Sequence, residues 1–430
     1  MSATQHPRPH VIVVNRWQEQ YARYAEYLDH ATHRVSYLST EIGLASVPAQ
    51  AHDVRVVRAT DDPAEVRPAL QELIARHGRP QAIVALKEDD LLIAAQLREE
   101  WEVPGPRVAD LTRFRDKYLM ASAVAAAGLE IPNFALVTDA ASVLEFGQAH
   151  GWPVVVKPIL GSSSDGVVKV DGPAEVAALD LADRPMMVQR FQPGQIYHVD
   201  GVFTGTELLV CRGSRYLNTC LGFRSGDALG SVEEDDPAIN AAIAESARAY
   251  LGALTDAPLV FHLELFVDTA AGPPRCSFLE VGARVGGAEI PFLWREVHGY
   301  DLMDAAFQLQ LGRPVPTVPE RTGGELAGFL LVPAPAARPC RIVEVTPMTG
   351  RPDGPYAEAL LPVGGVLPRA DAYYEHVGGR FRFRGARSGD VERAVAATAA
   401  AFRVAAVPLE GDETDQADQA QPQLLSAGRA

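Results

Sequence analysis

The sequence predicts a protein of several domains that combines α/β and α+β architecture. At 430 residues the chain is long enough for two or three domains with sizeable cores. Strand-like and helix-like segments alternate between residues 10 and 110. From about residue 321, Gly, Pro and short β-like pieces dominate. We therefore expect an N-terminal α/β domain over residues 1–111, a central region over 112–320 and a small α+β domain over 321–408.

The first hundred residues have the pattern of an α/β unit. Short apolar runs typical of buried parallel strands lie at residues 11–14, 54–57 and 82–86. The amphipathic segment 63–77 predicts a helix that ends at Gly78. An acidic run, Lys87-Glu-Asp-Asp90, directly follows the last strand. Ligands of open α/β sheets collect beyond the carboxyl ends of strands, so this run is a candidate substrate contact, although a solvated helix start is the commoner role.

The central region alternates helices and strands. We predict helices at 112–127, 139–150 and 237–251, and strands at 153–158, 167–170, 186–191 and 197–203. Gly252 is expected to end the third helix. In the C-terminal part, Gly378-Gly379 predicts a tight turn and residues 389–402 a closing helix. The tail 409–430, rich in Asp, Gln and Ala, is expected to be disordered.

Charge and composition exclude several classes of protein. The net charge is −16, with no basic stripe, which argues against nucleic-acid binding. The four cysteines are widely spaced without a Cys-x-x-Cys pair, which argues against a zinc site or a disulfide framework. The N-terminus lacks the pattern of a signal peptide, and no apolar run approaches the ~20 residues needed to span a bilayer. We expect a cytoplasmic protein without a membrane partner.

The most informative feature is a pair of glutamates in two strand-like segments. Residues 259–267 alternate around Glu264, and Glu280 lies in a second alternating segment. The connection 268–275 is rich in turn formers, and a hairpin folded about Gly272 sets the two glutamates opposite each other. Opposed side chains have Cβ atoms only ~5 Å apart, so two carboxylates there repel unless a cation such as Mg²⁺ lies between them. The alternative is a different register with one glutamate facing solvent.

Two further segments have the composition of a phosphate site. Just past Glu280, the run Glu280-Val-Gly-Ala-Arg-Val-Gly-Gly287 combines Arg284 with glycines that let a ligand approach the backbone. Lys157 ends a buried strand directly before the loop Gly161-Ser-Ser-Ser-Asp-Gly166, which offers hydroxyls and backbone N–H groups to anions. This loop is not a Walker A motif, and most such loops are only turns.

Other candidate residues are ambiguous when taken alone. Lys117 lies on a predicted helix, where a surface lysine is the commoner role. Residues 189–191 end a strand and could hold the edge of a flat heterocycle. His198 and His262 lie on strand faces, where core histidines are commoner than metal ligands. Arg212, Arg215 and Arg224 are candidates for binding a substrate carboxylate, although surface ion pairs are the commoner fate of such residues.

The order of these motifs is a specific signal. Arg-Asp-Lys117, Val-Val-Val-Lys-Pro158, a Gly/Ser loop, Val-Gln-Arg-Phe191 with Val-Asp-Gly201, His-x-Glu264 and Glu280-Val-x-x-Arg-x-Gly-Gly287 follow one another along the chain. This set resembles the ATP-grasp superfamily over about residues 112–312. The flanking segments are similar to the preceding domain and to the small C-terminal domain of the carboxylate–amine ligase (L-amino acid ligase-like) branch. The resemblance implies a three-domain ATP-grasp fold.

The resemblance also implies roles for individual residues. The residues implied to bind ATP are Lys117, Lys157, Gly161, Ser162, Ser163, Ser164, Gln189, Arg190, Phe191 and His198. In this scheme the two lysines contact the α- and β-phosphates, the 161–166 loop is a flap over the phosphates, and 189–191 holds the adenine edge. Glu264 and Glu280 are implied to bind Mg²⁺. Arg284 is implied to steady the transferring phosphoryl group.

Two positions depart from the family pattern. Many members carry Asn two residues after the second metal glutamate, where this chain has Gly282. Many also carry Glu where this chain has Ile196, so ribose recognition falls to another group, with Tyr197 and His198 as candidates.

The resemblance implies an ADP-forming ligase that joins a small-molecule carboxylate to an amine through an acyl-phosphate. Amino-acid or dipeptide-like substrates are expected because they are common in this branch, and dimers are usual in the superfamily, which makes a homodimer the expected assembly. Two alternatives stay open at this point. One is a biotin-carboxylase-like enzyme that activates bicarbonate, and the other is a nucleotide-binding module without catalysis.

Overall fold

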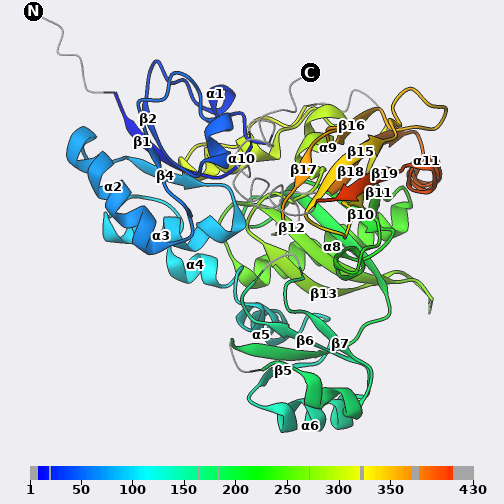
Figure 1. The fold of residues 1–430 in the computed structure, drawn as a ribbon. Coiled ribbons are helices and arrows are strands. Elements are labelled where there is room, and N and C mark those ends of the chain that lie inside the picture. The colour runs from blue at the N-terminus through cyan, green and yellow to red at the C-terminus, as the bar shows by residue number, and fades with distance from the viewer. Residues whose placement is uncertain are drawn as a thin grey trace, which may run out of the picture.

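The computed structural model describes residues 8–18, 21–161, 164–181, 184–270, 272–319, 324–369 and 377–409. Within these residues the strands form four sheets (Figure 1). The predicted disordered tail lies, apart from Leu409, outside the described residues. The described part has no helix that is both long enough and apolar enough to cross a membrane. All four cysteines are free thiols.

The N-terminal unit is a parallel sheet in the order β3-β2-β1-β4. Its strands are β1 (His10–Asn15), β2 (Arg34–Ser39), β3 (Asp53–Val56) and β4 (Ala82–Ala85). Helices of this unit are α1 (Tyr24–Tyr27), α2 (Pro63–His77), α3 (Leu91–Glu100) and α4 (Val108–Thr112). The three predicted strands and the helix 63–77 are confirmed, and the Asp62 side chain caps that helix by accepting from Ala64 N. The strand β2 was not predicted.

The central sheet has eight antiparallel strands in the order β13-β12-β9-β10-β11-β14-β18-β16. These strands are β9 (Gln195–Phe203), β10 (Leu208–Tyr216), β11 (Leu229–Glu233), β12 (Leu259–Asp268), β13 (Arg275–Gly282), β14 (Leu326–Pro333), β16 (Ala357–Leu360) and β18 (Val377–Gly385). Strands from both sides of residue 321 share this sheet. The domain boundaries themselves stay predictions.

The predicted turn at Gly378-Gly379 is wrong, because both residues lie inside β18. A Cβ added at Gly378 would lie 2.7 Å from the Pro333 carbonyl oxygen of the neighbouring strand. Gly378 therefore allows the backbones of two neighbouring strands to approach closely, and it does not reverse the chain.

A separate four-stranded sheet, in the order β5-β8-β6-β7, forms the small lobe at the bottom of Figure 1. Its strands are β5 (Phe134–Val137), β6 (Val154–Pro158), β7 (Val168–Val170) and β8 (Met186–Arg190), and α6 (Ala140–His150) covers it. The predicted strands and the helix 139–150 are confirmed within one or two residues. This lobe has its own apolar cluster, which includes Val143, Phe146, Val156 and Val188.

Two predicted helix boundaries are wrong. The helix α5 (Lys117–Ala126) begins five residues after the predicted start, because the Asp116 side chain caps it by accepting from Tyr118 N and Leu119 N. The helix α8 (Pro237–Leu254) runs through Gly252 and does not end before it. Leu254 is 1% exposed, and its burial offsets the cost of about 1 kcal/mol for a glycine inside a helix.

The remaining elements belong to the central region and to the C-terminal part. They are α7 (Cys220–Arg224), α9 (Ile290–Glu296), α10 (Leu302–Gln310), α11 (Ser388–Ala401) and the three-stranded sheet of β17 (Val366–Leu367), β15 (Cys340–Val345) and β19 (Val404–Pro408). The predicted closing helix 389–402 is confirmed as α11.

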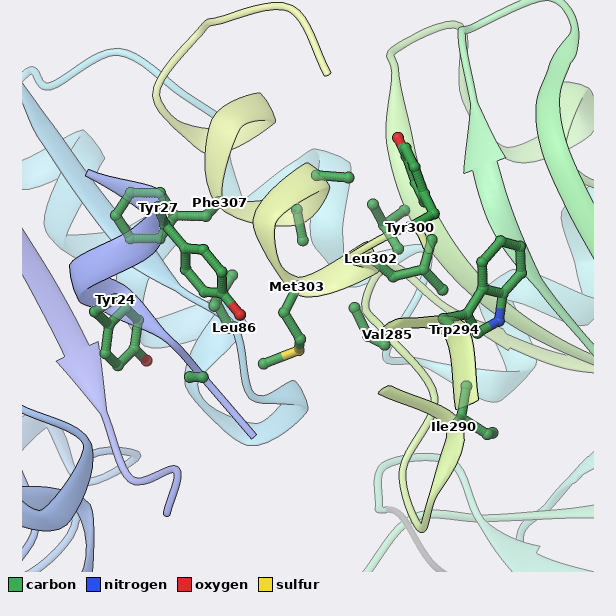
Figure 2. Close-up of a cluster of buried hydrophobic side chains, with 14 of the residues drawn as sticks. Tyr24, Tyr27, Leu86, Val285, Ile290, Trp294, Tyr300, Leu302, Met303 and Phe307 are labelled. Carbon is green, nitrogen blue, oxygen red and sulfur yellow. The ribbon is translucent and has the colours of Figure 1, made fainter. Parts of the chain in front are cut away.

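One apolar cluster joins the N-terminal sheet to the central region (Figure 2). Tyr24 and Leu86 come from the N-terminal unit, and Met303 and Phe307 on α10 pack between them and the residues around Trp294. This shared core holds the carboxyl end of β4 next to the end of β13. The two ends meet at the site described next.

Candidate active site

The site is built on the β12–β13 hairpin. Glu264 pairs directly with Glu280, with a bulge between Glu264 and Leu265, so the register predicted from the sequence is confirmed. Residues that are paired in this way project to the same face of the sheet. The Glu264 side chain is 14% exposed and that of Glu280 is 36% exposed. Two carboxylates therefore share one partly open position at the edge of the sheet.

Polar side chains continue from this hairpin across the same sheet face. We call the directly paired residues Glu280, Glu264, His198, Ser214 and Glu233 the polar row. The neighbouring row along the strands contains Gly282, His262, Asp200 and Arg212. A sheet face buried by an ordinary core is apolar, so two polar rows that run inward from the edge strand β13 of an eight-stranded sheet indicate a functional surface.

Asp200 links two histidines behind the glutamates. Its carboxylate accepts from His198 Nδ1 at 2.6 Å and from His262 Nδ1 at 2.8 Å. Burial alone lowers the pKa of His262, but the charge and hydrogen bond of Asp200 outweigh it and raise that pKa to about 9. The protonated ring lies beside Glu264, with 3.8 Å between Nε2 and Oε1, and Tyr216 donates to the same oxygen at 3.0 Å. Glu264 is thus held from two sides.

His198, Asp200 and His262 have the spacing of a metal-ligand set. The ring nitrogens that face Asp200 already hydrogen-bond to it, and His198 Nε2 bonds Ser231 Oγ at 2.6 Å. These contacts satisfy the buried groups without an ion. The geometry accordingly favours a hydrogen-bonded support for Glu264.

Lys117 lies at the start of α5 and points to the hairpin. Its Nζ is 3.6 Å from Glu280 Oε2 and donates to the Gly161 carbonyl at 2.8 Å. The lysine predicted from the sequence thus connects the second glutamate to the first residue of the Gly/Ser loop. Ser164 has φ +55°, while Ser162 and Ser163 lie outside the described residues.

Lys157 reaches the site from the small lobe. It is 4% exposed, and its Nζ donates to Gln189 Oε1 at 2.9 Å. Burial lowers its pKa to about 8, although Glu280 and Glu264 attract the charge. Arg190 ends β8 and is exposed, and Phe191, which follows the strand, is half-buried with Lys169 Nζ 5.0 Å from its ring centre. The structure brings Lys157 and Gln189 together on the two central strands of the small sheet, β6 and β8.

Arg284 has a partner that sequence reasoning missed. Its Nε and Nη2 contact Glu88 Oε2 at 2.6 and 2.5 Å, and Arg115 Nη1 lies 2.5 Å from Glu88 Oε1. The acidic run at 87–90 was a predicted candidate, but its partner could not be read from local pattern. The residues that line the pocket here are Glu88, Phe114, Arg115, Lys117, Met120, Gly161, His262, Glu280, Val281, Gly282 and Arg284.

The remaining candidates divide into those near the sheet face and those away from it. Arg212 lies 3.9 Å from Glu233 Oε2 and borders a second pocket on the polar row with Trp294. Arg215 pairs with Glu392 and Arg224 with Asp165, the surface ion pairs that were the alternative expectation. Tyr197 donates to Glu234 at 2.6 Å, and His198 is 3% exposed with both ring nitrogens bonded. Ribose contact by either residue stays a prediction.

No family model matches the chain. It is 23% identical over 321 residues to the L-arginine-specific L-amino acid ligase of Bacillus subtilis, covering 70% of this chain and 74% of that protein. It is 25% identical to dapdiamide A synthase of Enterobacter agglomerans, covering 67% and 68% of the two chains. Both relatives are named as a ligase or a synthase.

The fold agrees with these relatives. An L-amino acid ligase from Bacillus licheniformis superimposes with a TM-score of 0.73 at 16% identity, covering 94% of this chain and all of that one. Biotin carboxylase from Campylobacter jejuni superimposes with a TM-score of 0.65 at 13% identity, covering 93% and 92%. The ordered motifs, the paired glutamates and these similarities lead to one conclusion: the chain has the ATP-grasp fold, and its sequence is similar to ligases that include an L-amino acid ligase.

Proposed function

We propose that the protein is an ATP- and Mg²⁺-dependent ligase that joins an amino-acid-like carboxylate to an amine, with Glu264, Glu280 and Arg284 at its reaction centre. The observation that carries this proposal is the direct pairing of Glu264 with Glu280, in a pocket that also contains Lys117 and Arg284. In the reaction, a carboxylate oxygen attacks the γ-phosphorus and ADP leaves. The amine nitrogen then attacks the acyl carbon, phosphate leaves and the amine gives up a proton.

The donor set fits a hard divalent cation. Glu264 and Glu280 offer carboxylate oxygens on one sheet face, and Mg²⁺ prefers such oxygens and shares its coordination with phosphates. Bound Mg²⁺ would neutralise charge on the phosphates during transfer. The two glutamates would hold the ion, while His262 and Tyr216 fix the orientation of Glu264.

The cationic groups fit the phosphates of a nucleotide. Lys117 and Lys157 reach the pocket region from α5 and β6, and Arg284 reaches it from the end of β13. Lysine acts as a point charge, whereas arginine offers a planar fork that matches phosphate oxygens. We assign the lysines to nucleotide binding and Arg284 to the phosphoryl group that is transferred. The loop 161–166 would cover the phosphates, and Gln189 would hold the adenine edge.

The substrates are proposed from the relatives and from the polar rows. One of the relatives is an L-arginine-specific L-amino acid ligase. Of the three arginines predicted to bind a substrate carboxylate, Arg212 is the one that lies on the same sheet face as the glutamates and borders the second pocket, so it is our candidate. We also expect a cytoplasmic protein, in keeping with its four free cysteines, and a homodimer as is usual in the superfamily.

The proposal is tested by measuring ADP release against a panel of carboxylate and amine pairs, with amide products identified by mass spectrometry. The ligase predicts ADP release that requires one carboxylate and one amine together. Release stimulated instead by bicarbonate and biotin would identify the carboxylase alternative. ATP binding without ADP release under any pair would favour a non-catalytic nucleotide-binding module.

A further inference from the structure

Glu88 brings three segments of the chain together at the proposed phosphoryl site. It begins the short turn Glu88–Asp90 after β4, at the carboxyl end of the parallel sheet. One carboxylate oxygen contacts Arg284 Nε and Nη2 at 2.6 and 2.5 Å, and the other lies 2.5 Å from Arg115 Nη1. The Glu88 side chain is 15% exposed, and burial would raise its pKa, but the two guanidinium groups lower that pKa to about 2. Glu88 is therefore a fixed negative charge between two arginines.

The contact orients Arg284 without using all of its donors. A guanidinium has five N–H donors. The Nε and Nη2 contacts to Glu88, together with a bond from Nη1 to the Val285 carbonyl at 2.9 Å, use three of them. One N–H on each terminal nitrogen is left by these contacts for a phosphate oxygen. An arginine held along one edge keeps its plane, and less side-chain entropy is lost when it binds.

The glycine at 282 makes room for this arrangement. A Cβ added at Gly282 would lie 3.4 Å from Glu88 Oε1 and 3.5 Å from Arg284 Nε. An alanine methyl would just fit, whereas a longer polar side chain would enter the space between the carboxylate and the guanidinium. The departure from the expected asparagine thus coincides with a carboxylate supplied from the N-terminal unit.

We propose that Glu88 is a positioning residue for Arg284, and that Gly282 is the residue that permits the contact. The proposal rests on the proposed function, because it assigns Arg284 to the transferring phosphoryl group. Glu88 orients the Arg284 guanidinium before ATP binds. Because Glu88 follows β4 of the N-terminal sheet, the position of that sheet then determines where Arg284 lies beside the β12–β13 hairpin. A displacement of a reacting group by ~1 Å costs on the order of 10²-fold in rate.

The first test compares Glu88→Gln and Glu88→Ala with wild type. If Glu88 positions Arg284, kcat falls on the order of 10²-fold, while the Kd of Mg·ATP measured by calorimetry changes by less than about threefold. Glutamine keeps part of the geometry and should lose less than alanine. An unchanged kcat would overturn the proposal. So would tighter ATP binding with faster turnover, which would mean that Glu88 sequesters Arg284.

Glu289→Gln is the matched control. Glu289 is also a buried carboxylate between two arginines, with Arg380 Nη1 at 3.3 Å and Arg382 Nε at 3.4 Å, but it lines neither pocket. Loss of this ion pair should lower stability without the specific fall in kcat. An equal fall in kcat in this variant would show that the Glu88 effect is a general consequence of weaker domain packing, which would contradict positioning.

The second test uses Gly282→Asn in a double-mutant cycle with Glu88→Ala. The asparagine should disturb the Glu88–Arg284 contact in the wild-type background and cost little where Glu88 is already removed. Both kcat and the free energy of unfolding are measured for each variant of the cycle. Additive effects of the two substitutions on the free energy of unfolding would contradict the proposed role of Gly282 in the Glu88–Arg284 contact. The unfolding measurement needs no turnover. If the wild type released no ADP with any substrate pair, the proposed function would fail while the cycle still reported on the contact.

Discussion

The β12–β13 hairpin and the small β5–β8 lobe both contribute charged groups to the site, but they hold them differently. On the hairpin side, Glu264 contacts His262 and Tyr216, and Arg284 contacts Glu88. On the lobe side, buried Lys157 has one neutral partner, Gln189, and a pKa lowered to about 8. The hairpin groups are thus arranged before any ligand binds, whereas the lobe keeps a lysine whose charge is fully stabilised only by an incoming anion.

This contrast indicates a division of work between the two regions. A preorganised set of charges stabilises developing charge in a reaction without reorganisation. The protonated form of a buried lysine with a lowered pKa is stabilised most when a phosphate binds beside it. We therefore expect substitutions in the hairpin to affect turnover, and substitutions in the lobe to affect nucleotide affinity and its pH dependence.

The largest effect is expected for Arg284→Ala. An arginine that faces the charge developing in phosphoryl transfer is worth ~10³-fold or more in kcat. We expect this loss with the affinity for ATP largely retained, measured by ADP release and by calorimetry. Unchanged turnover would show that Arg284, on the hairpin side, takes no part in the reaction. It would also contradict the proposed division of work between the hairpin and the lobe.

Asp200→Asn should lower stability as well as activity. Removing one partner of a buried, hydrogen-bonded ion pair costs about 3–5 kcal/mol, and Asp200 is 1% exposed between two histidines. The raised pKa of His262 contributes stability that is fully present below pH about 6.5 and is lost as pH rises through about 9. Urea unfolding of the variant should lack this pH dependence. An equal slope in both proteins would show that Asp200 does not hold the charge of His262.

Lys157→Met tests whether the pH dependence of ATP affinity and of stability comes from the lobe. Above pH about 8 the free lysine loses its proton, so the affinity of wild type for ATP should weaken as pH rises, by up to about tenfold per pH unit. The stability of the ligand-free protein should rise over the same range, because between about 8 and 10.5 the unfolded chain binds more protons. The methionine variant should lack both trends in calorimetry and urea unfolding. If both trends persisted in this variant, another group would be responsible.

Gln189→Ala should give the smallest effect. It leaves the Lys157 Nζ without the acceptor at 2.9 Å, which should cost about 1–2 kcal/mol of stability. We expect ATP affinity to weaken by less than about tenfold and kcat to stay within about twofold. A loss of kcat comparable to that of Arg284→Ala would contradict the division between the two regions.

The local part of this account could be predicted from the sequence. The glutamate pairing followed from two alternating strands and a connection rich in turn formers, because register across a hairpin is set by short-range pattern. The strand β2 was not predicted because Ser36 and Ser39 interrupt its apolar run. Both serines are buried, and their hydroxyl groups form hydrogen bonds with the side chains of His10 and Asn15, which satisfy these polar groups in the core.

Contacts between distant segments could not be predicted in this way. Glu88 and Arg284 are 196 residues apart, and their strand ends are brought together by the shared core around Met303 and Phe307 and by hydrogen bonds between Gln310 and the backbone of Ala85. The support of Glu264 by Asp200 through His262 also depends on the order of strands in the sheet. An alternating strand shows which side chains share a face, but it does not show which strand lies beside it.

The most direct test of the account is the ratio of amide formed to ADP released in wild type and in Glu280→Ala, each with Mg²⁺ and a productive carboxylate and amine. We predict one amide per ADP in wild type, and a loss of both products on the order of 10³-fold in the variant, since a metal ligand supplies several kcal/mol of charge stabilisation. Equal rates of ADP release in the two proteins would contradict the claim that the paired glutamates of the hairpin form the reaction centre.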